Sequence, residues 1–206
     1  MKRVSRSRVA RASHGYEYIV FNKPYGVMTS FTDGQNRATL ADYISIPQVY
    51  AAGRLDRDSE GLLLLTSDGN FVHVLTDPRH KLPKTYLVQV EDIPDAKSVD
   101  RLRNGVLIQG KQTKPANVEL LGYVPDLWPR EIPIRFRKSV PTAWLHMAIS
   151  EGMNRQIRRM TAAVGHPTLR VVRMAIGPIH VDSLLPGQWR RLEQTEIQAV
   201  FDMTRP

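Results

Sequence analysis

Residues 51–65 combine a dense group of charged side chains with a directly following apolar run. Two arginines, two aspartates and a glutamate lie between Gly53 and Gly61, and Leu62–Leu65 comes next. A carboxylate here would lie at the edge of a hydrophobic core. Neighbouring arginines would keep it ionised, because a nearby positive charge lowers the pKa of a carboxyl group. The pattern indicates a reactive carboxylate, and the alternative is an exposed loop whose charges pair with one another.

A second group of polar residues lies at the start of the most regular helical pattern, residues 154–164. At about 3.6 residues per turn, one arc of this helix is apolar and the opposite arc is basic. Like charges three and four residues apart repel, and the first half of a helix favours anions rather than cations. We therefore expect an anion to meet this face, the alternative being a solvated arginine face. The apolar arc comprises Ile157, Met160, Thr161 and Val164, and the basic arc Arg155, Arg158 and Arg159.

Three further patterns do not support a phosphate or metal site. The spacing of Gly105–Lys111 fits a phosphate-binding loop, but Gln112 stands where a Ser or Thr would hold magnesium. The segment from Asp56 imitates the start of a calcium loop, but Ser67 stands where the loop needs a glutamate. The six histidines include no pair at helical ligand spacing. We expect no metal site.

Composition favours a nucleic-acid partner. The 206 residues include 29 Lys and Arg against 20 Asp and Glu, for a net charge of +9. This excess of positive charge favours a polyanionic binding partner. Nucleic acid is the first expectation and an acidic membrane surface the second. No cysteine is present, which excludes disulfides, cysteine-ligated zinc and thiol nucleophiles. No apolar run approaches the roughly 20 residues of a spanning helix, and no secretory signal is evident. We expect a cytoplasmic monomer.

The first 16 residues form a separate basic segment. Five Lys and Arg occur there without an acidic residue, and serines separate the arginines. This composition predicts a disordered basic arm. The alternatives are a solvated terminus with no partner and a short transit peptide.

Periodicity and turn residues predict a strand-rich chain without repeats, and we expect one domain over residues 17–206. The mixed order of elements favours an α+β fold with a mostly antiparallel sheet flanked by helices. Helices are expected at residues 39–44, 70–75, 94–104, 154–164 and 195–201. Strands are expected at residues 18–21, 62–65, 85–90, 106–108, 117–121, 132–136, 144–149, 171–176 and 189–192.

Several motifs, in the same order, resemble the RsuA class of pseudouridine synthases, which act on bacterial ribosomal RNA. The resemblance extends from about Tyr18 to Leu192 and is specific, because it rests on several motifs together. These are Asn22-Lys23-Pro24-x-Gly26-Val27, Gly53-Arg54-Leu55-Asp56 with Ser59-Glu60-Gly61-Leu62-Leu63, Lys84-Thr85-Tyr86, Glu151-Gly152-x-Asn154-Arg155-Gln156-Ile157-Arg158-Arg159-Met160, Ile176-Gly177-Pro178, and Pro186-Gly187-x-Trp189-Arg190.

The resemblance implies a role for several side chains. Asp56 would be the essential catalytic carboxylate, acting at the ribose or at the uracil ring, and Arg158 would pair with it. Tyr86 would stack on the target base, and Arg54 would help to displace the uridine, which must be flipped out of its stack. Residues 169–171 would form an apolar wall. The remaining RNA-binding candidates are Arg155, Arg159, Lys84 and Arg57.

The resemblance also implies a substrate. Most members of the class carry an S4-type RNA-binding domain before the catalytic domain, and this chain presents only the basic arm. It is therefore similar to the short members that modify a uridine in 23S rRNA, either in the RNA itself or in a large-subunit assembly particle. The same chemistry on 16S rRNA or tRNA is an alternative, as is a non-catalytic RNA-binding protein of ribosome assembly. Breaking and reforming one glycosidic bond requires no metal or organic cofactor.

Overall fold

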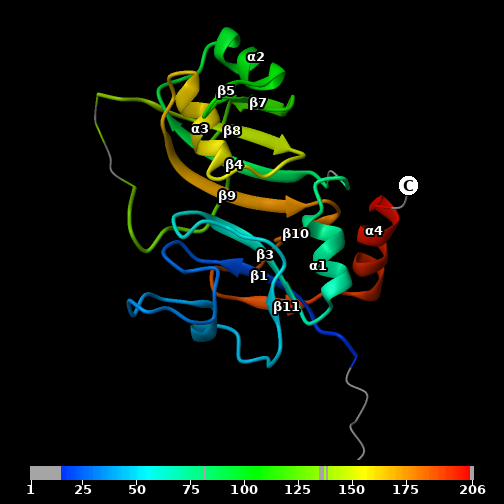
Figure 1. The fold of residues 1–206 in the computed structure, drawn as a ribbon. Coiled ribbons are helices and arrows are strands. Elements are labelled where there is room, and N and C mark those ends of the chain that lie inside the picture. The colour runs from blue at the N-terminus through cyan, green and yellow to red at the C-terminus, as the bar shows by residue number, and fades with distance from the viewer. Residues whose placement is uncertain (1–14, 81, 135–136, 138, 205–206) are drawn as a thin grey trace, which may run out of the picture.

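The structure, a computed structural model, describes residues 15–80, 82–134, 137 and 139–204. Residues 1–14, which hold the predicted basic arm except for its last two positions, lie outside the described residues. The fold is built around one large sheet, with helices packed against each of its two halves (Figure 1).

Nine strands form this sheet, in the order β11-β1-β3-β9-β4-β8-β7, with β10 paired to β9 and β2 to β3. The pairing of β3 with β9 is parallel, and the other described pairings are antiparallel, which confirms the predicted α+β class. A separate hairpin consists of β5 and β6. The strands are β1 (Tyr18–Lys23), β2 (Tyr50–Ala51), β3 (Glu60–Thr66), β4 (Lys84–Glu91), β5 (Leu107–Ile108), β6 (Lys111–Gln112), β7 (Asn117–Leu121), β8 (Thr142–Ile149), β9 (Thr168–Ile176), β10 (Ile179–His180) and β11 (Trp189–Arg191).

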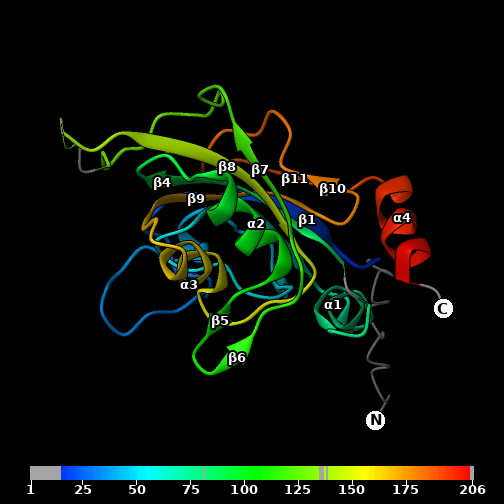
Figure 2. The ribbon, with the colours of Figure 1, turned by 90° about the horizontal axis from the view of Figure 1, so that it is seen from above.

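The helices cover the two halves of the sheet separately. The helices α2 and α3 lie beside the half that contains β4, β7 and β8, whereas α1 and α4 lie together at the other end of the molecule (Figures 1 and 2). A short 3-10 helix, η1, precedes β2. The bounds are η1 (Leu40–Asp42), α1 (Gly69–Thr76), α2 (Ala96–Asn104), α3 (Gln156–Ala163) and α4 (Gln194–Thr204).

The two halves meet at a short parallel contact between β3 and β9. Only Glu60 opposite Val172 and Gly61 opposite Arg173 are paired there. Gly61 has φ +98°, and a Cβ atom on it would come 2.3 Å from the backbone oxygen of Arg173. Glycine is thus required for β3 to approach β9, which brings the loop before β3 close to β4 and β9.

The apolar run of β3 is buried on both faces. Leu62 and Leu64 belong to a core that includes residues of α1 and α4, and Leu63 and Leu65 to a core that includes Leu40 of η1. A third core lies between the β4–β8 half and the helices α2 and α3. Burial on both faces explains why this strand reads as a continuous leucine run rather than as an alternating pattern.

Most predicted elements are confirmed, but the predicted strand at residues 132–136 is wrong for its described part. Residues 132–134 form a bend and irregular chain in the long connection between β7 and β8. Pro133 lacks the backbone N–H that an inner strand needs for its hydrogen-bond ladder. The two-residue strands β2, β6 and β10 were not expected, since strands so short carry no periodicity.

Helix boundaries differ where local backbone geometry intervenes. The helix expected from residue 154 begins at Gln156, because Arg155 adopts a left-handed conformation with φ 51°. The helix expected from residue 94 begins at Ala96 and is capped by Asp95, whose carboxylate accepts a hydrogen bond from the backbone N–H of Ser98. Of the helix expected at 39–44, only the 3-10 turn η1 is formed.

Candidate functional site

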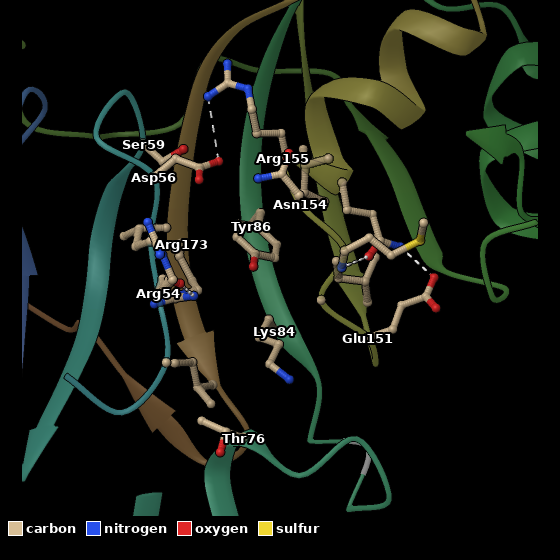
Figure 3. Close-up of a pocket in the computed structure, with 18 of the residues that line it drawn as sticks. Arg54, Asp56, Ser59, Thr76, Lys84, Tyr86, Glu151, Asn154, Arg155 and Arg173 are labelled. Atoms are coloured by element: carbon tan, nitrogen blue, oxygen red, sulfur yellow. Dashed lines mark hydrogen bonds and ion pairs between the residues drawn. The ribbon is translucent and has the colours of Figure 1, made fainter. Parts of the chain in front are cut away.

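A cavity of about 660 Å³ is lined by residues of the charged motifs described in the sequence (Figure 3). Segments that are distant in the sequence form its walls: the loop before β3, the end of α1, the start of β4, the connection from β8 into α3, and β9. Asp56, Tyr86 and Arg158 all line it. Three motifs of the sequence therefore meet at one site.

The loop that carries Asp56 is fixed from both sides. Leu55 is buried, and its backbone oxygen accepts a hydrogen bond from the Thr29 hydroxyl. The backbone oxygen of Arg54 accepts a hydrogen bond of 3.2 Å from the Arg173 guanidinium. These contacts hold Asp56 in the wall of the cavity, where its side chain is 37% exposed and its carboxylate lies 3.8 Å from Nη1 of Arg155.

The strongest ion pair of this loop involves Asp58. Its carboxylate accepts two hydrogen bonds of 2.8 Å from Arg155 and lies 3.3 Å from Nε of Arg158. Burial of Asp58 opposes its ionisation, but the hydrogen bonds from Arg155 and the charge of Arg158 outweigh that effect and lower the pKa of the carboxyl group. Asp58 is therefore ionised at neutral pH.

The expected pairing of Arg158 with Asp56 is corrected by this geometry. Arg158 instead donates hydrogen bonds to the backbone oxygens of Asp58, at 2.6 Å, and of Thr168, at 3.3 Å. The ion pair to Asp56 comes from Arg155, whose left-handed backbone at the start of α3 differs from the helical conformation that the sequence analysis assumed. Arg158 thus ties the Asp56 loop to the start of β9.

Tyr86 and Lys84 present a second wall of the site from β4. They are two residues apart and therefore share one face of the strand. Tyr86 is buried, and its ring lies between Arg173 and the 151–155 segment (Figure 3). Burial, together with the charge of Arg173, lowers the pKa of the Lys84 amine. This wall offers an aromatic ring beside cations.

Arg173 is a site residue that the sequence analysis missed. It is buried in β9, donates a hydrogen bond of 2.8 Å to the backbone oxygen of Leu62, and lines the cavity. The available signal was a charged residue inside the apolar run 171–176, since a buried arginine needs partners that hold its charge. The sequence alone does not reveal that β9 pairs with β3, and so it does not show that Arg173 lies at the site.

Some of the other site residues expected from the sequence line the cavity, and others lie outside it. Arg54, Lys84 and Arg155 line the cavity, whereas Arg57 and Arg159 do not. Arg159 contacts Gln109 in the β5–β6 hairpin and Asn154. Arg57 is exposed, and its Nε donates to the backbone oxygen of Gly26.

The predicted apolar wall at 169–171 is correct only for Val171. Leu169 does not line the cavity; it lies at an irregularity in the pairing of β9 with β4, between Thr168 and Arg170, which interrupts the alternation of side chains there. The apolar lining is completed by Ile176 at the end of β9 and by residues of other elements, namely Leu75, Ile149, Met153 and Ile157. The core stripe predicted for α3 is confirmed, since Ile157, Met160, Thr161 and Val164 are all buried.

A buried charge network lies directly behind the loop that carries Asp56. The carboxylate of Glu60 accepts hydrogen bonds from Arg170, the shortest at 2.6 Å, and lies 3.2 Å from Nε of Arg130. The indole of Trp128 donates to the same carboxylate at 3.3 Å, and the Arg130 guanidinium stacks 3.7 Å from the centroid of the Tyr25 ring. The long β7–β8 connection is thereby attached to the first residue of β3.

Neither a metal centre nor a membrane-spanning element is found in the part of the chain that the structure describes. No group of three or more His, Asp or Glu side chains there could hold a metal ion. No helix among those residues is long and apolar enough to cross a membrane.

Comparison with known proteins gives consistent matches over most of the chain. A family model described as RNA pseudouridylate synthase matches residues 17–163. Among solved structures, one described as a crystal structure of pseudouridylate synthase superimposes with a TM-score of 0.75 at 32% sequence identity. That superposition covers 90% of this chain and 74% of the solved one.

Two curated relatives differ in how similar they are to this chain. It is 59% identical over 174 residues to the ribosomal large subunit pseudouridine synthase E of Xanthomonas campestris pv. campestris, covering 84% of this chain and 93% of the relative. It is 35% identical over 193 residues to the ribosomal small subunit pseudouridine synthase A of Vibrio cholerae, covering 91% and 75%. The similarity to the large-subunit protein is thus much higher.

Proposed function

The chain belongs to the RNA pseudouridylate synthase family, and we propose that it converts one uridine of 23S rRNA, in the large ribosomal subunit, to pseudouridine. The observation that carries this proposal is that Asp56 lines the same cavity as Tyr86 and several cations. The 59% identity to a large-subunit enzyme, against 35% to a small-subunit enzyme, favours 23S rRNA over 16S rRNA.

The reaction makes defined demands on the site. The bond from N1 of uracil to C1′ of the ribose breaks, the ring turns, and a bond from C5 to C1′ forms. The proton on C5 is released, and N1 takes up a proton, so atoms and charge balance without an oxidant or reductant. The site must therefore hold a detached uracil in place, which a cavity with an aromatic wall can do.

Asp56 is the essential carboxylate of this proposal. It is half-exposed, so it can reach the ribose or the uracil ring of a nucleotide that enters the cavity. Arg155 and Arg158 hold the Asp56 loop through Asp58 and so position the carboxylate without consuming it in a close ion pair. Preorganisation requires that the reacting group stays available while the residues that hold it are rigid.

Tyr86 would stack on the uracil, and Arg54 would help to displace the uridine from its helix. A base inside a stack cannot be reached by a side chain, so the nucleotide has to be flipped out, at a cost of a few kcal/mol. Contacts of the basic surface with phosphates offset that cost, Arg57, Lys84, Arg155 and Arg159 being the candidates. We propose that one copy of the domain at residues 17–206 carries this activity, in the cytoplasm where bacterial ribosomes are assembled.

The test is release of tritium from RNA labelled at uridine C5. We expect release from 23S transcripts or from immature large-subunit particles, and little from 16S rRNA or tRNA. Asp56→Asn should abolish release while RNA binding and thermal stability stay unchanged, because an amide keeps the shape of the side chain and removes its charge. Asp92→Asn, at an exposed position with the same change of group, should behave like the unaltered protein.

Release of tritium by Asp56→Asn at the normal rate would contradict the proposed role of this carboxylate. Absence of release from every RNA and particle would instead favour the alternative of a non-catalytic RNA-binding protein of ribosome assembly. Release from 16S rRNA or tRNA alone would retain the chemistry and change the substrate.

A further inference from the structure

A second cavity, of about 480 Å³, adjoins the first. The two cavities share Arg54, Leu55, Asp56 and Arg155 as lining residues, so the short Asp56 loop is their common wall. The remaining lining of the second cavity comes from residues that do not line the first. These residues are Tyr25, Gly26, Met28, Thr29, Arg37, Arg57, Asp58 and Ile132.

The lining of this second cavity combines cations with apolar surface. Four arginines line it against two aspartates, and Tyr25, Met28 and Ile132 contribute apolar area. Arg37 is paired with Asp33, and Arg155 with Asp58. Arg54 and Arg57 are exposed and form no ion pair with a carboxylate of the described chain, so they are available to a phosphate. This lining is complementary to a nucleotide, whose anionic phosphate can pair with the cations and whose flat base can pack on the apolar surface.

We propose that the second cavity binds the nucleotide that directly follows or precedes the target uridine, and so contributes to the choice of the site. The inference rests on the proposed function. With the uridine in the first cavity, its ribose lies beside Asp56, and the strand has to continue past the shared wall. One phosphodiester then separates the two bases, and Arg54 and Arg57 lie at that wall to contact its phosphate.

The cavity is preformed rather than dependent on a loose loop. Ile132 belongs to the long β7–β8 connection, which is anchored two and four residues earlier by Arg130 and Trp128 on the buried Glu60. The stack of Arg130 on Tyr25 joins this connection to another wall of the same cavity. Ile132 is therefore held at the cavity while its side chain remains 57% exposed.

The experiment compares cavity variants on RNA that has or lacks the neighbouring base. Fragments that contain the reactive uridine, with tritium at C5, are made intact, with an abasic 5′ neighbour, or with an abasic 3′ neighbour. Ile132→Trp fills the second cavity, and Ile93→Trp adds the same side chain at another exposed position, 62% exposed and outside both cavities. Tritium release gives kcat/KM for each pair of protein and RNA.

We expect one abasic neighbour to lower kcat/KM of the unaltered protein about tenfold or more, in line with the loss of one stacked base. Ile132→Trp should cause a similar loss on intact RNA but less than about a twofold further loss on that abasic RNA, and Ile93→Trp should cause none. Equal losses from Ile132→Trp on intact and abasic RNA, or no loss from it at all, would overturn the inference alone. Failure of the unaltered protein to release tritium from any RNA would instead overturn the proposed function, and this inference with it.

Discussion

The guanidinium of Arg155 forms two hydrogen bonds of 2.8 Å with the carboxylate of Asp58, while Asp56, two residues earlier, lies 3.8 Å from the same group. The first contact is a bidentate ion pair and the second is a looser one. The arginines thus pair more closely with Asp58 than with Asp56, the proposed catalytic carboxylate. Asp58 acts as the anchor through which α3 positions the Asp56 loop.

Asp58→Asn should therefore lower kcat with little effect on KM. The variant removes the charge that holds Arg155 and Arg158, so these cations are free to shift toward Asp56. We expect a loss in kcat of roughly tenfold, equivalent to about 1.4 kcal/mol in the activation barrier. RNA affinity should not fall, because the change removes a negative charge from the surface that is proposed to contact phosphates. Steady-state tritium release over a range of RNA concentrations separates the two parameters.

A matched control for this variant is Glu17→Gln. Glu17 accepts two hydrogen bonds from Arg191 and lies outside both cavities. Both ion pairs are partly exposed, so each amide variant should change the free energy of unfolding by about 1 kcal/mol or less. A fall in kcat for Glu17→Gln as large as that for Asp58→Asn would show that the loss is not specific to the Asp56 loop.

Tyr86 provides a test of stacking on the base. Tyr86→Phe keeps the ring, whereas Tyr86→Leu keeps apolar volume without a ring. If stacking is the main contribution of Tyr86, kcat/KM of the leucine variant should fall about 10- to 100-fold below that of the phenylalanine variant, because stacking on one base contributes about 1–3 kcal/mol. Equal activities of the two variants, both folded by circular dichroism, would contradict a stacking role.

Local pattern predicted the parts of the site that lie in continuous segments. The leucine run of β3, the alternation of β4 and the apolar arc of α3 follow from periodicity alone. Asp56, Tyr86 and Arg158 were found because each stands in a motif that is complete within a few residues. All three line one cavity.

Contacts between distant segments were beyond the sequence. The parallel contact of Gly61 with Arg173 joins residues more than a hundred positions apart, and no local signal marks it. The sequence also does not show that Asp58, rather than Asp56, is the close partner of the arginines of α3. Arg155 reaches Asp58 from a left-handed backbone conformation. Non-glycine residues adopt that conformation seldom, so helical periodicity predicts the wrong direction for this side chain.

Glu60→Gln should be strongly destabilising. The Glu60 side chain is 2% exposed, and its carboxylate is shared by Arg170, Arg130 and Trp128. Removing one partner of a buried ion pair costs about 3–5 kcal/mol, because the remaining charges stay buried without compensation. Urea denaturation should reveal a loss of this size, and the exposed Glu119→Gln should cause a change within about 0.5 kcal/mol. A loss under about 1 kcal/mol for Glu60→Gln would contradict the network.

Lys23 predicts how stability depends on pH. It is fully buried, its amine donates to the backbone oxygens of Pro24 at 2.8 Å and Val27 at 2.9 Å, and burial lowers its pKa to about 7. Below pH 7 the folded and unfolded states both hold the proton. Between pH 7 and the unfolded pKa of 10.5, only the unfolded state holds it. Since stability rises with pH wherever the unfolded state binds more protons, the free energy of unfolding should increase across this interval.

Lys23→Met removes this titration and should flatten the rise. The comparison is the slope of the unfolding free energy against pH, measured by urea denaturation from pH 7 to 9. The absolute value is not compared, because the variant also loses the three hydrogen bonds of the amine, to the backbone oxygens of Pro24, Val27 and Arg57. Lys111→Met, at an exposed position of β6, should keep the slope of the unaltered protein. Parallel curves for Lys23→Met and the unaltered protein would mean that Lys23 stays protonated in the folded state. In that case its hydrogen bonds to the 24–27 turn would outweigh the cost of burying its charge.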